Sequence, residues 1–265
     1  MEKITELEKL AKTIRLDVLK MTYEKKTGFI GTAFSCADIL AVLYGDIVRA
    51  EHDIVIMSKG HGAVGWYAAL AETGYFDKAK LDSEFNVSGY KMGVHPKRNA
   101  YPGIYTSSGS LGQGEGLGCG VALASRIQNK DRRVYVIMGD GECNEGSVWE
   151  AFMFAKRYKL DNLVFIIDRN KLQSYGHDSD VLNMDNMTEK VASFGLNTIE
   201  VDGHNVEELC KAFGQAELIK DVPTCIVANT IKGKGCSVFE DKVLWHYKWP
   251  EKEHLEQALL ELGEV

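Results

Sequence analysis

The feature that most constrains the fold is a series of short apolar segments that alternate with helical patterns. The segments cover residues 53–57, 133–138, 162–168, 197–201 and 223–230. Strands that are apolar on both faces are typical of parallel sheets, in which helices cover both sides. The helical patterns between the segments provide the crossover connections that parallel strands need. The sequence therefore predicts an α/β fold, with a parallel sheet and helices on both faces.

Apolar residues three and four positions apart predict the helices around this sheet. They are expected at residues 5–26, 36–48, 63–73, 110–127, 147–158, 187–194, 206–219 and 254–262. Residues 74–109 are rich in Gly, Ser and Tyr and lack periodicity, and loops this long inside a domain are usually functional. No linker rich in Pro or Ser divides the chain, so we expect a single domain over residues 1–265.

Charge and composition argue against several classes of protein. The chain has 31 basic and 38 acidic residues, a net charge of −7, whereas nucleic-acid binders usually carry a basic excess. No run approaches the ~20 apolar residues that cross a bilayer. The N-terminus is charged and lacks an apolar secretory segment. The six cysteines show no CxxC pair and no metal spacing, which indicates reduced thiols. We expect a cytoplasmic protein that binds neither nucleic acid nor membrane.

Polar residues follow two of the predicted strands, at the edge where parallel sheets bind ligands. Gly139-Asp140-Gly141 ends one strand, and Asn170 follows the next strand along the chain. A carboxylate, an amide oxygen and a backbone carbonyl suit Mg²⁺ or Ca²⁺ that completes its shell with phosphate oxygens and water. Glycine lets the backbone approach a phosphate, and the helix after Glu145 can point its positive end at the anion. The alternative is a pair of ordinary strand-end turns.

A glycine run at residues 109–116 offers a second candidate contact with a ligand. The run does not match GxGxxG, and no clear strand precedes it, so a dinucleotide site is not indicated. We interpret it as a glycine-rich helix start beside a ligand. The alternative is that these glycines serve close packing between helices.

Several segments together carry a resemblance to one family. They are SKGHG at 58–62, GVHP at 93–96, GIYTSSGSLGQG at 103–114, the GDG, NEG and Asn170 pattern within 139–170, KGKG at 232–235 and Trp245-His246. In this order, and over nearly the whole chain, they resemble the N-terminal, diphosphate-binding half of transketolases. The resemblance implies that the single domain has the thiamine diphosphate-binding fold.

The resemblance also implies a cofactor and a metal ion. Asp140, Asn170 and the Leu172 carbonyl would hold Mg²⁺ or Ca²⁺ against the diphosphate of thiamine diphosphate. The residues that it places at the cofactor are His61, Gly109, Leu111, Gly141, Glu142, Asn170 and His246.

By the same resemblance, the catalytic residues are His61, His95, His246 and Glu145. His95 would face the sugar hydroxyls as a proton donor or acceptor, and Glu145 would join a carboxylate relay across a subunit interface. Histidine suits proton transfer near neutral pH. The remaining histidines are expected at surface or capping positions: His52, His177, His204 and His254.

The implied activity is that of a transketolase-type glycolaldehyde transferase. A two-carbon ketol unit would pass from a ketose donor to an aldose acceptor through a thiamine diphosphate enamine, and the substrates would be small sugars or sugar phosphates. Full-length transketolases continue with a pyrimidine-binding domain and a C-terminal domain, and we expect both on a partner chain. We therefore expect the N-terminal subunit of a split enzyme. It would be active only with a C-terminal subunit that carries the pyrimidine-binding domain, in an α2β2 assembly.

One position departs from the family pattern. The stretch Thr27-Gly28-Phe29-Ile30-Gly31 stands where transketolases usually have S-G-H-x-G, and in the family that histidine reaches toward the sugar hydroxyls. A phenyl ring cannot replace such a hydrogen bond. We hypothesise that Phe29 determines substrate specificity and that the sugar is less polar at that point, such as a deoxy or otherwise modified sugar. The alternative is that Phe29 is a core residue.

Two other functions are compatible with parts of this pattern. The α subunit of a 2-oxoacid dehydrogenase also carries a GDGxxNEG-like stretch, and activity with a 2-oxoacid rather than a ketose would identify it. A non-catalytic regulatory or binding module could retain the fold without the site. Failure to bind thiamine diphosphate with Mg²⁺, even with a partner present, would support that interpretation.

Overall fold

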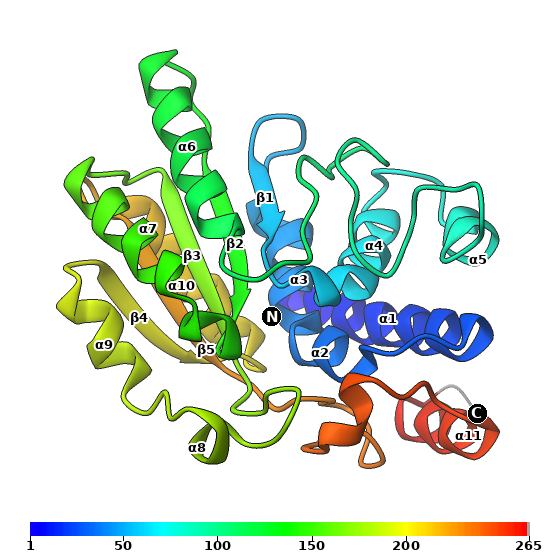
Figure 1. The fold of residues 1–265 in the computed structure, drawn as a ribbon. Coiled ribbons are helices and arrows are strands. Elements are labelled where there is room, and N and C mark those ends of the chain that lie inside the picture. Colours follow the sequence, from blue (N-terminus) through cyan, green and yellow to red (C-terminus); the bar gives the residue numbers. More distant parts are fainter. Residues whose placement is uncertain (264–265) are drawn as a thin grey trace.

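A parallel sheet of five strands forms the centre of the computed structural model, which describes residues 1–263 (Figure 1). The strand order is β1 (Ile54–Met57), β2 (Val134–Gly139), β3 (Leu163–Arg169), β5 (Thr224–Asn229) and β4 (Asn197–Asp202). All neighbouring strands pair in parallel. The predicted α/β fold is confirmed, and the last two residues of the expected domain lie outside the described part of the chain.

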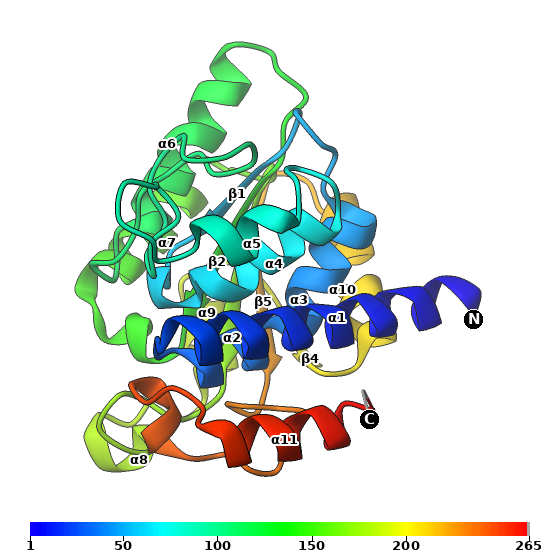
Figure 2. The same ribbon diagram turned by 90° about the vertical axis from the view of Figure 1, so that its right-hand side faces the viewer.

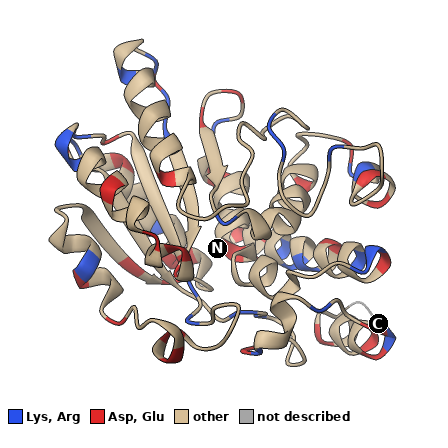
Figure 3. Ribbon diagram, viewed as in Figure 1, with Lys and Arg blue, Asp and Glu red and all other residues tan. Residues whose placement is uncertain are grey.

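Helices cover both faces of the sheet because alternate residues of each strand point to opposite sides. Val55 and Met57 belong to a core shared with α1 (Glu2–Lys25), α3 (Ala37–Val42), α4 (Ala63–Glu72) and α10 (Val206–Leu218). Ile54 and Ile56 belong to a second core, shared with α6 (Gly114–Ile127), α7 (Gly146–Arg157) and α9 (Met187–Ser193). Figure 3 shows that the strands carry few charges and that charged residues gather on the outer helices.

The order in which the chain forms neighbouring strands explains which face of the sheet each crossover helix covers. The chain moves from β2 to β3 through α7 and from β3 to the edge strand β4 through α9, and both helices lie on one face. It then turns back from β4 to β5 through α10, which lies on the other face. A right-handed crossover must change face when the direction reverses, so the topology follows the usual rule.

Shorter elements complete the fold outside the sheet and its main helices. They are α2 (Ile30–Ser35), α5 (Ala79–Glu84), α8 (Asp178–Val181), α11 (Lys252–Glu261), a π-helical turn η1 (Leu43–Ile47), and the 3₁₀ turns η2 (Gly60–Gly62), η3 (Gly141–Asn144) and η4 (Val243–His246). The C-terminal helix α11 runs beside α1 in both views (Figure 2). Among the described residues, no helix is long and apolar enough to cross a membrane.

Three of the predicted element boundaries are wrong. The helix expected over 36–48 begins at Ile30, breaks at Cys36 and ends in the π-helical turn, and every residue from 30 to 43 is buried. Without an exposed polar face, the periodicity could not mark where each helix starts. The loop expected over 74–109 contains α5. The helix expected from residue 110 starts at Gly114, because Gly112 has a left-handed backbone conformation (φ 72°).

Candidate functional site

A cavity of about 290 Å³ lies at the carboxyl ends of the strands, as expected for a parallel sheet. Strand β1 leads into Lys59, β2 into Asp140 and β3 into Asn170, so three neighbouring strands deliver side chains to one place. The predicted site residues that line the cavity are Phe29, His61, His95, Gly109, Leu111, Asp140, Gly141, Glu142, Asn170, Leu172 and His246. Glu145 is the predicted residue that is not among the lining residues.

The predicted metal ligands lie together in this cavity and are already ordered by backbone hydrogen bonds. One oxygen of Asp140 accepts from the Gly141 amide at 2.7 Å, and the other accepts from the Lys171 amide. The Asn170 side-chain oxygen accepts from the Leu172 amide at 3.1 Å. Burial, and then the charge of Asp168, raise the pKa of Asp140 to about 6, so this group remains a carboxylate at neutral pH.

Two buried lysines at the same cavity were missed by the sequence analysis. The ammonium of Lys232 donates to the Leu172 carbonyl at 2.8 Å and to Nδ1 of His246 at 2.9 Å. Burial lowers the pKa of Lys232 to about 8. Lys59 is fully buried and also lines the cavity. Both lysines belong to segments that carry the family resemblance, SKGHG and KGKG, so a search of those motifs for cations could have found them.

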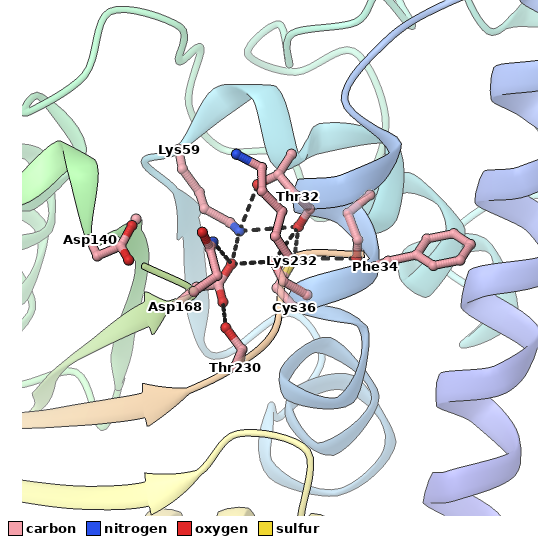
Figure 4. A network of polar contacts seen from close by, with 12 residues as sticks. Thr32, Phe34, Cys36, Lys59, Asp140, Asp168, Thr230 and Lys232 are labelled. Atoms are coloured by element: carbon pink, nitrogen blue, oxygen red, sulfur yellow. Dashed lines mark hydrogen bonds and ion pairs between the residues drawn. The ribbon is translucent and has the colours of Figure 1, made fainter. Parts of the chain in front are cut away.

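Lys59 is held by an ion pair with Asp168 at the centre of a buried polar network (Figure 4). Asp168 also accepts from Ser35 Oγ at 2.5 Å, from Thr230 Oγ1 and from the Asn170 amide at 3.4 Å. Burial alone would raise the pKa of Asp168, but the charge and hydrogen bond of Lys59 lower it. The network therefore keeps Asp168 ionised, and it fixes the orientation of the Asn170 side chain.

The polar groups of the cavity fit a diphosphate with one divalent cation. Among residues 1–263, no group of three or more His, Cys, Asp or Glu side chains could hold a metal by itself. One carboxylate, one amide oxygen and one carbonyl leave coordination positions that phosphate oxygens and water can fill. The side-chain nitrogen of Gln173 lines this cavity, buried and without a hydrogen-bond partner in the described chain. A ligand with several acceptor oxygens would satisfy this donor and the third N–H group of Lys232, whose other two already have acceptors.

Phe29 lies among the three predicted catalytic histidines rather than in the core. Its ring centroid is 5.8 Å from that of His61, 5.6 Å from that of His95 and 5.6 Å from that of His246. The backbone of Phe29 is left-handed (φ 71°), and its amide donates to the His246 carbonyl at 3.2 Å. The phenyl ring therefore forms part of the wall that a substrate at these histidines would meet.

The three histidines have lowered pKa values and are neutral at pH 7. Burial, followed by the charges of Lys232 and Lys59, lowers the pKa of His246 to about 3. Burial and the charge of Lys59 also lower the pKa of His61 well below its usual value, and burial lowers that of His95. Since Lys232 donates to Nδ1 of His246, the proton of that imidazole lies on Nε2. Neutral imidazoles can donate with one nitrogen and accept with the other.

The two predicted glutamates differ in their surroundings. Glu142 is buried, and its carboxylate accepts from Ser58 Oγ at 2.6 Å and from the amides of Gly112 and Gly139 at 2.9 and 3.2 Å. The buried Glu142 side chain therefore links the glycine run at Gly112 to the GDG turn at Gly139. Glu145 is exposed at the start of α7, outside the cavity lining. Its predicted place at a subunit interface stays a prediction.

The side chains of two of the remaining histidines form hydrogen bonds with other residues of the chain. His254 accepts from the Glu251 amide as part of the cap of α11, so the capping prediction is confirmed for it. The side chain of His204 is only 12% exposed and is hydrogen-bonded at both ring nitrogens, so the surface prediction is wrong for this residue.

The fold and the cavity together define a class of protein: a parallel α/β domain with a polar pocket at the carboxyl edge of its sheet, of a kind that fits a diphosphate. The sequence model of one family, described as "Transketolase, thiamine diphosphate binding domain", matches residues 7–259. The chain belongs to the transketolase family, and the resemblance seen in its motifs is confirmed.

The relatives include both split and full-length enzymes. The chain is 38% identical to one subunit of the apulose-4-phosphate transketolase of Actinobacillus succinogenes, covering 97% of this chain and 96% of that protein. It is 35% identical to "6-deoxy-6-sulfo-D-fructose transketolase subunit SqwG" of a Clostridium species, covering 98% of both. It is 40% identical to human transketolase over 98% of this chain but only 42% of that protein.

Solved structures agree with the fold. Transketolase from Leishmania mexicana superposes with a TM-score of 0.90 at 29% identity, over 97% of this chain and 41% of that one. Transketolase from Campylobacter jejuni gives 0.86 at 26% identity, over 99% and 43%. The thiamine diphosphate-binding α/β fold is thus confirmed. The relatives also support a transketolase-type transferase over the α subunit of a 2-oxoacid dehydrogenase and over a non-catalytic module.

Proposed function

We propose that this chain is the diphosphate-binding subunit of a two-chain transketolase, working with thiamine diphosphate and Mg²⁺. The observation that carries the proposal is the convergence of Asp140, Asn170 and the Leu172 carbonyl with two buried lysines in one cavity. When bound, thiamine diphosphate supplies the carbon that accepts and releases a two-carbon ketol unit. The chain would pass this unit from a ketose donor to an aldose acceptor.

Each group of the cavity has a task in this proposal. Asp140, Asn170 and the Leu172 carbonyl would hold the cation, with Ca²⁺ as an alternative to Mg²⁺. Lys232 would offset part of the diphosphate charge that remains after the cation binds, while Lys59 would keep Asp168 ionised beside Asn170. The neutral His61, His95 and His246 would exchange protons with the substrate hydroxyls and exclude water from the reacting atoms.

A second chain is the other part of the proposal. Relatives of nearly the same length are named as single subunits of their transketolases, while the chain spans about two fifths of the full-length transketolases. The partner would carry the pyrimidine-binding domain and form an α2β2 assembly, with Glu145 at the interface. Helices α6 and α7 start beside the cavity and leave several large apolar side chains exposed: Leu117, Met153, Phe154 and Tyr158. We propose that the partner covers this face.

One substitution tests the partner face without disturbing the fold. A side chain added at Gly116 of α6 would meet no atom of this chain within 4 Å. Gly116→Trp should therefore leave the chain folded and weaken its association with the partner. Gly214→Trp on α10, where there is equal space, is the matched control. Equal association of both variants in sedimentation experiments would show that the partner binds elsewhere.

The position of Phe29 supports a modified sugar as substrate. Two relatives are named for apulose 4-phosphate and for 6-deoxy-6-sulfo-D-fructose. An apolar ring among three histidines leaves the substrate without a hydrogen bond at that point, which costs a hydroxylated sugar about 0.5–1.5 kcal/mol. Phe29→His should shift kcat/KM toward ordinary ketose phosphates. If the preference across a panel of sugars stays the same, Phe29 has a packing role only.

An activity assay tests the function as a whole. The chain should be inactive alone and should transfer a ketol unit from a ketose when mixed with a C-terminal transketolase subunit. Turnover of a 2-oxoacid by the mixture, or full ketol transfer by the isolated chain, would contradict the proposal. We place the enzyme in the cytoplasm, in keeping with its six cysteines, all of which are free thiols in the described chain.

A further inference from the structure

The segment 230–235 after strand β5 carries Lys232 into the cofactor cavity, and its backbone is irregular. Gly233 and Gly235 have φ angles of 82° and 107°, which glycine adopts without strain. The position of Lys232 therefore depends on backbone hydrogen bonds, one of which its own carbonyl accepts from the Asp241 amide at 2.9 Å. One contact on its carboxyl side is made by the Gly233 amide, which donates to the Gly31 carbonyl of α2 at 2.9 Å.

On its amino side, the Thr230 amide donates to the Arg169 carbonyl at 3.0 Å, and the next residue, Ile231, is held by His204. The Ile231 amide donates to Nε2 of His204 at 2.8 Å. A backbone N–H can only donate, so Nε2 carries a lone pair and the imidazole proton lies on Nδ1. Nδ1 is 2.8 Å from Oδ2 of Asp38, an acceptor. His204 is thus a neutral bridge from the backbone of the segment to a carboxylate on α3.

Asp38 is itself fixed by a second helix. Arg15 of α1 donates to both oxygens of Asp38, at 3.1 and 2.5 Å, and its Nε donates to the Lys234 carbonyl at 2.9 Å. Burial alone would raise the pKa of Asp38, but the bonds from His204 and Arg15 lower it. The side chains of Arg15, Asp38 and His204 are 8%, 9% and 12% exposed. One network therefore holds the segment on both sides of Lys232.

We propose that His204 is a positioning residue, which fixes the Ile231 backbone so that the Lys232 ammonium stays at the Leu172 carbonyl and His246. This inference rests on the proposed binding of thiamine diphosphate and Mg²⁺ in the cavity. His204 does not line that cavity and acts through the backbone alone.

Two substitutions separate the two hydrogen bonds of His204. His204→Asn places an amide nitrogen near the former Nδ1, which keeps the bond to Asp38 and loses the acceptor for Ile231. His204→Gln places an amide oxygen near the former Nε2, which keeps the acceptor for Ile231 and loses the direct bond to Asp38. His177→Asn, an exposed histidine on the turn before α8, is the control.

The measurement is the affinity of the chain, mixed with its partner subunit, for thiamine diphosphate in the presence of Mg²⁺. One lost hydrogen bond predicts about three- to tenfold weaker binding for His204→Asn. His204→Gln and His177→Asn should stay within about twofold of the unchanged protein. In a Lys232→Met background, His204→Asn should cause no further loss, because the side chain that it positions is gone. Hydrogen exchange at the Ile231 amide should be faster with Asn than with Gln.

Each outcome distinguishes the inference from the proposed function. If the unchanged pair of subunits does not bind thiamine diphosphate, both are wrong. If it binds, the inference alone is wrong when Asn and Gln weaken binding equally, or when His204→Asn has its full effect in the Lys232→Met background. Such results would mean that His204 supports the fold in general and not the place of Lys232.

Discussion

Glu115 gives the sharpest test of the electrostatics beside the site. This residue of the first turn of α6 is fully buried, and neither of its carboxylate oxygens has a hydrogen-bond partner in the described chain. Burial, followed by the negative charge of Glu142, raises the pKa of Glu115 from 4.5 to about 8. The native protein therefore holds Glu115 protonated at pH 7, while the unfolded chain releases that proton.

The sign and size of the effect follow from proton linkage. The folded pKa is raised, so the native state binds one more proton than the unfolded state between pH 4.5 and 8. The free energy of unfolding then falls by about 1.4 kcal/mol for each pH unit in that window, about 5 kcal/mol in all. Glu115→Gln removes the titration. Apart from a constant offset, the variant should gain stability relative to the unchanged protein as the pH rises from 4.5 to 8.

Denaturant unfolding of the purified chain at several pH values measures this difference. The amide of glutamine is also unpartnered, which adds a constant offset, so the pH dependence of the difference is the quantity to compare. Glu150→Gln, at an exposed position of α7, is the control for the loss of a glutamate. A pH-independent effect of Glu115→Gln would refute the reasoning, since it would mean that Glu115 ionises normally in the native protein.

Two further predictions concern the cavity itself. His61→Ala should reduce kcat more than the affinity for thiamine diphosphate. One hydrogen bond contributes only about 0.5–1.5 kcal/mol, while the cation anchors the diphosphate. Rate measurements and a cofactor titration test this, and an affinity that falls as far as kcat would contradict it. Lys59→Met should lower the free energy of unfolding by about 3–5 kcal/mol, because it leaves the carboxylate of Asp168 buried without its partner. Denaturant unfolding at pH 7 tests this, and an unchanged midpoint and slope would rule it out.

The sheet could be predicted because its strands are apolar on both faces over whole runs, such as residues 163–167. The helices at 30–42 were harder to predict, because they are buried on all sides and lack the polar face that marks a boundary. Hydrophobic periodicity thus predicts helices that have one buried and one exposed face. It does not predict the boundaries of a helix that lies wholly in the core.

The cavity residues could be predicted from sequence motifs. The side chains that hold them in place could not, because their partners lie far away in the sequence. Lys59 and Asp168 are 109 residues apart, and His204 reaches Asp38 across 166 residues. No local spacing indicates such pairs. Glu115 offered one local signal, an acidic residue inside a run of glycines. Its burial beside Glu142 is a result of tertiary packing alone.

The most direct test of the proposed function is the Mg²⁺-dependent binding of thiamine diphosphate by the two subunits together. Asp140→Ala and Asn170→Ala should each weaken binding by at least about tenfold, because loss of even an outer-shell contact to a metal ligand costs about 10–100-fold. Asp180→Ala, at an exposed position of α8, should bind as the unchanged protein does. Binding of the cofactor should disappear when Mg²⁺ is removed by a chelator. Unchanged affinity in both cavity variants would contradict the assignment of the site.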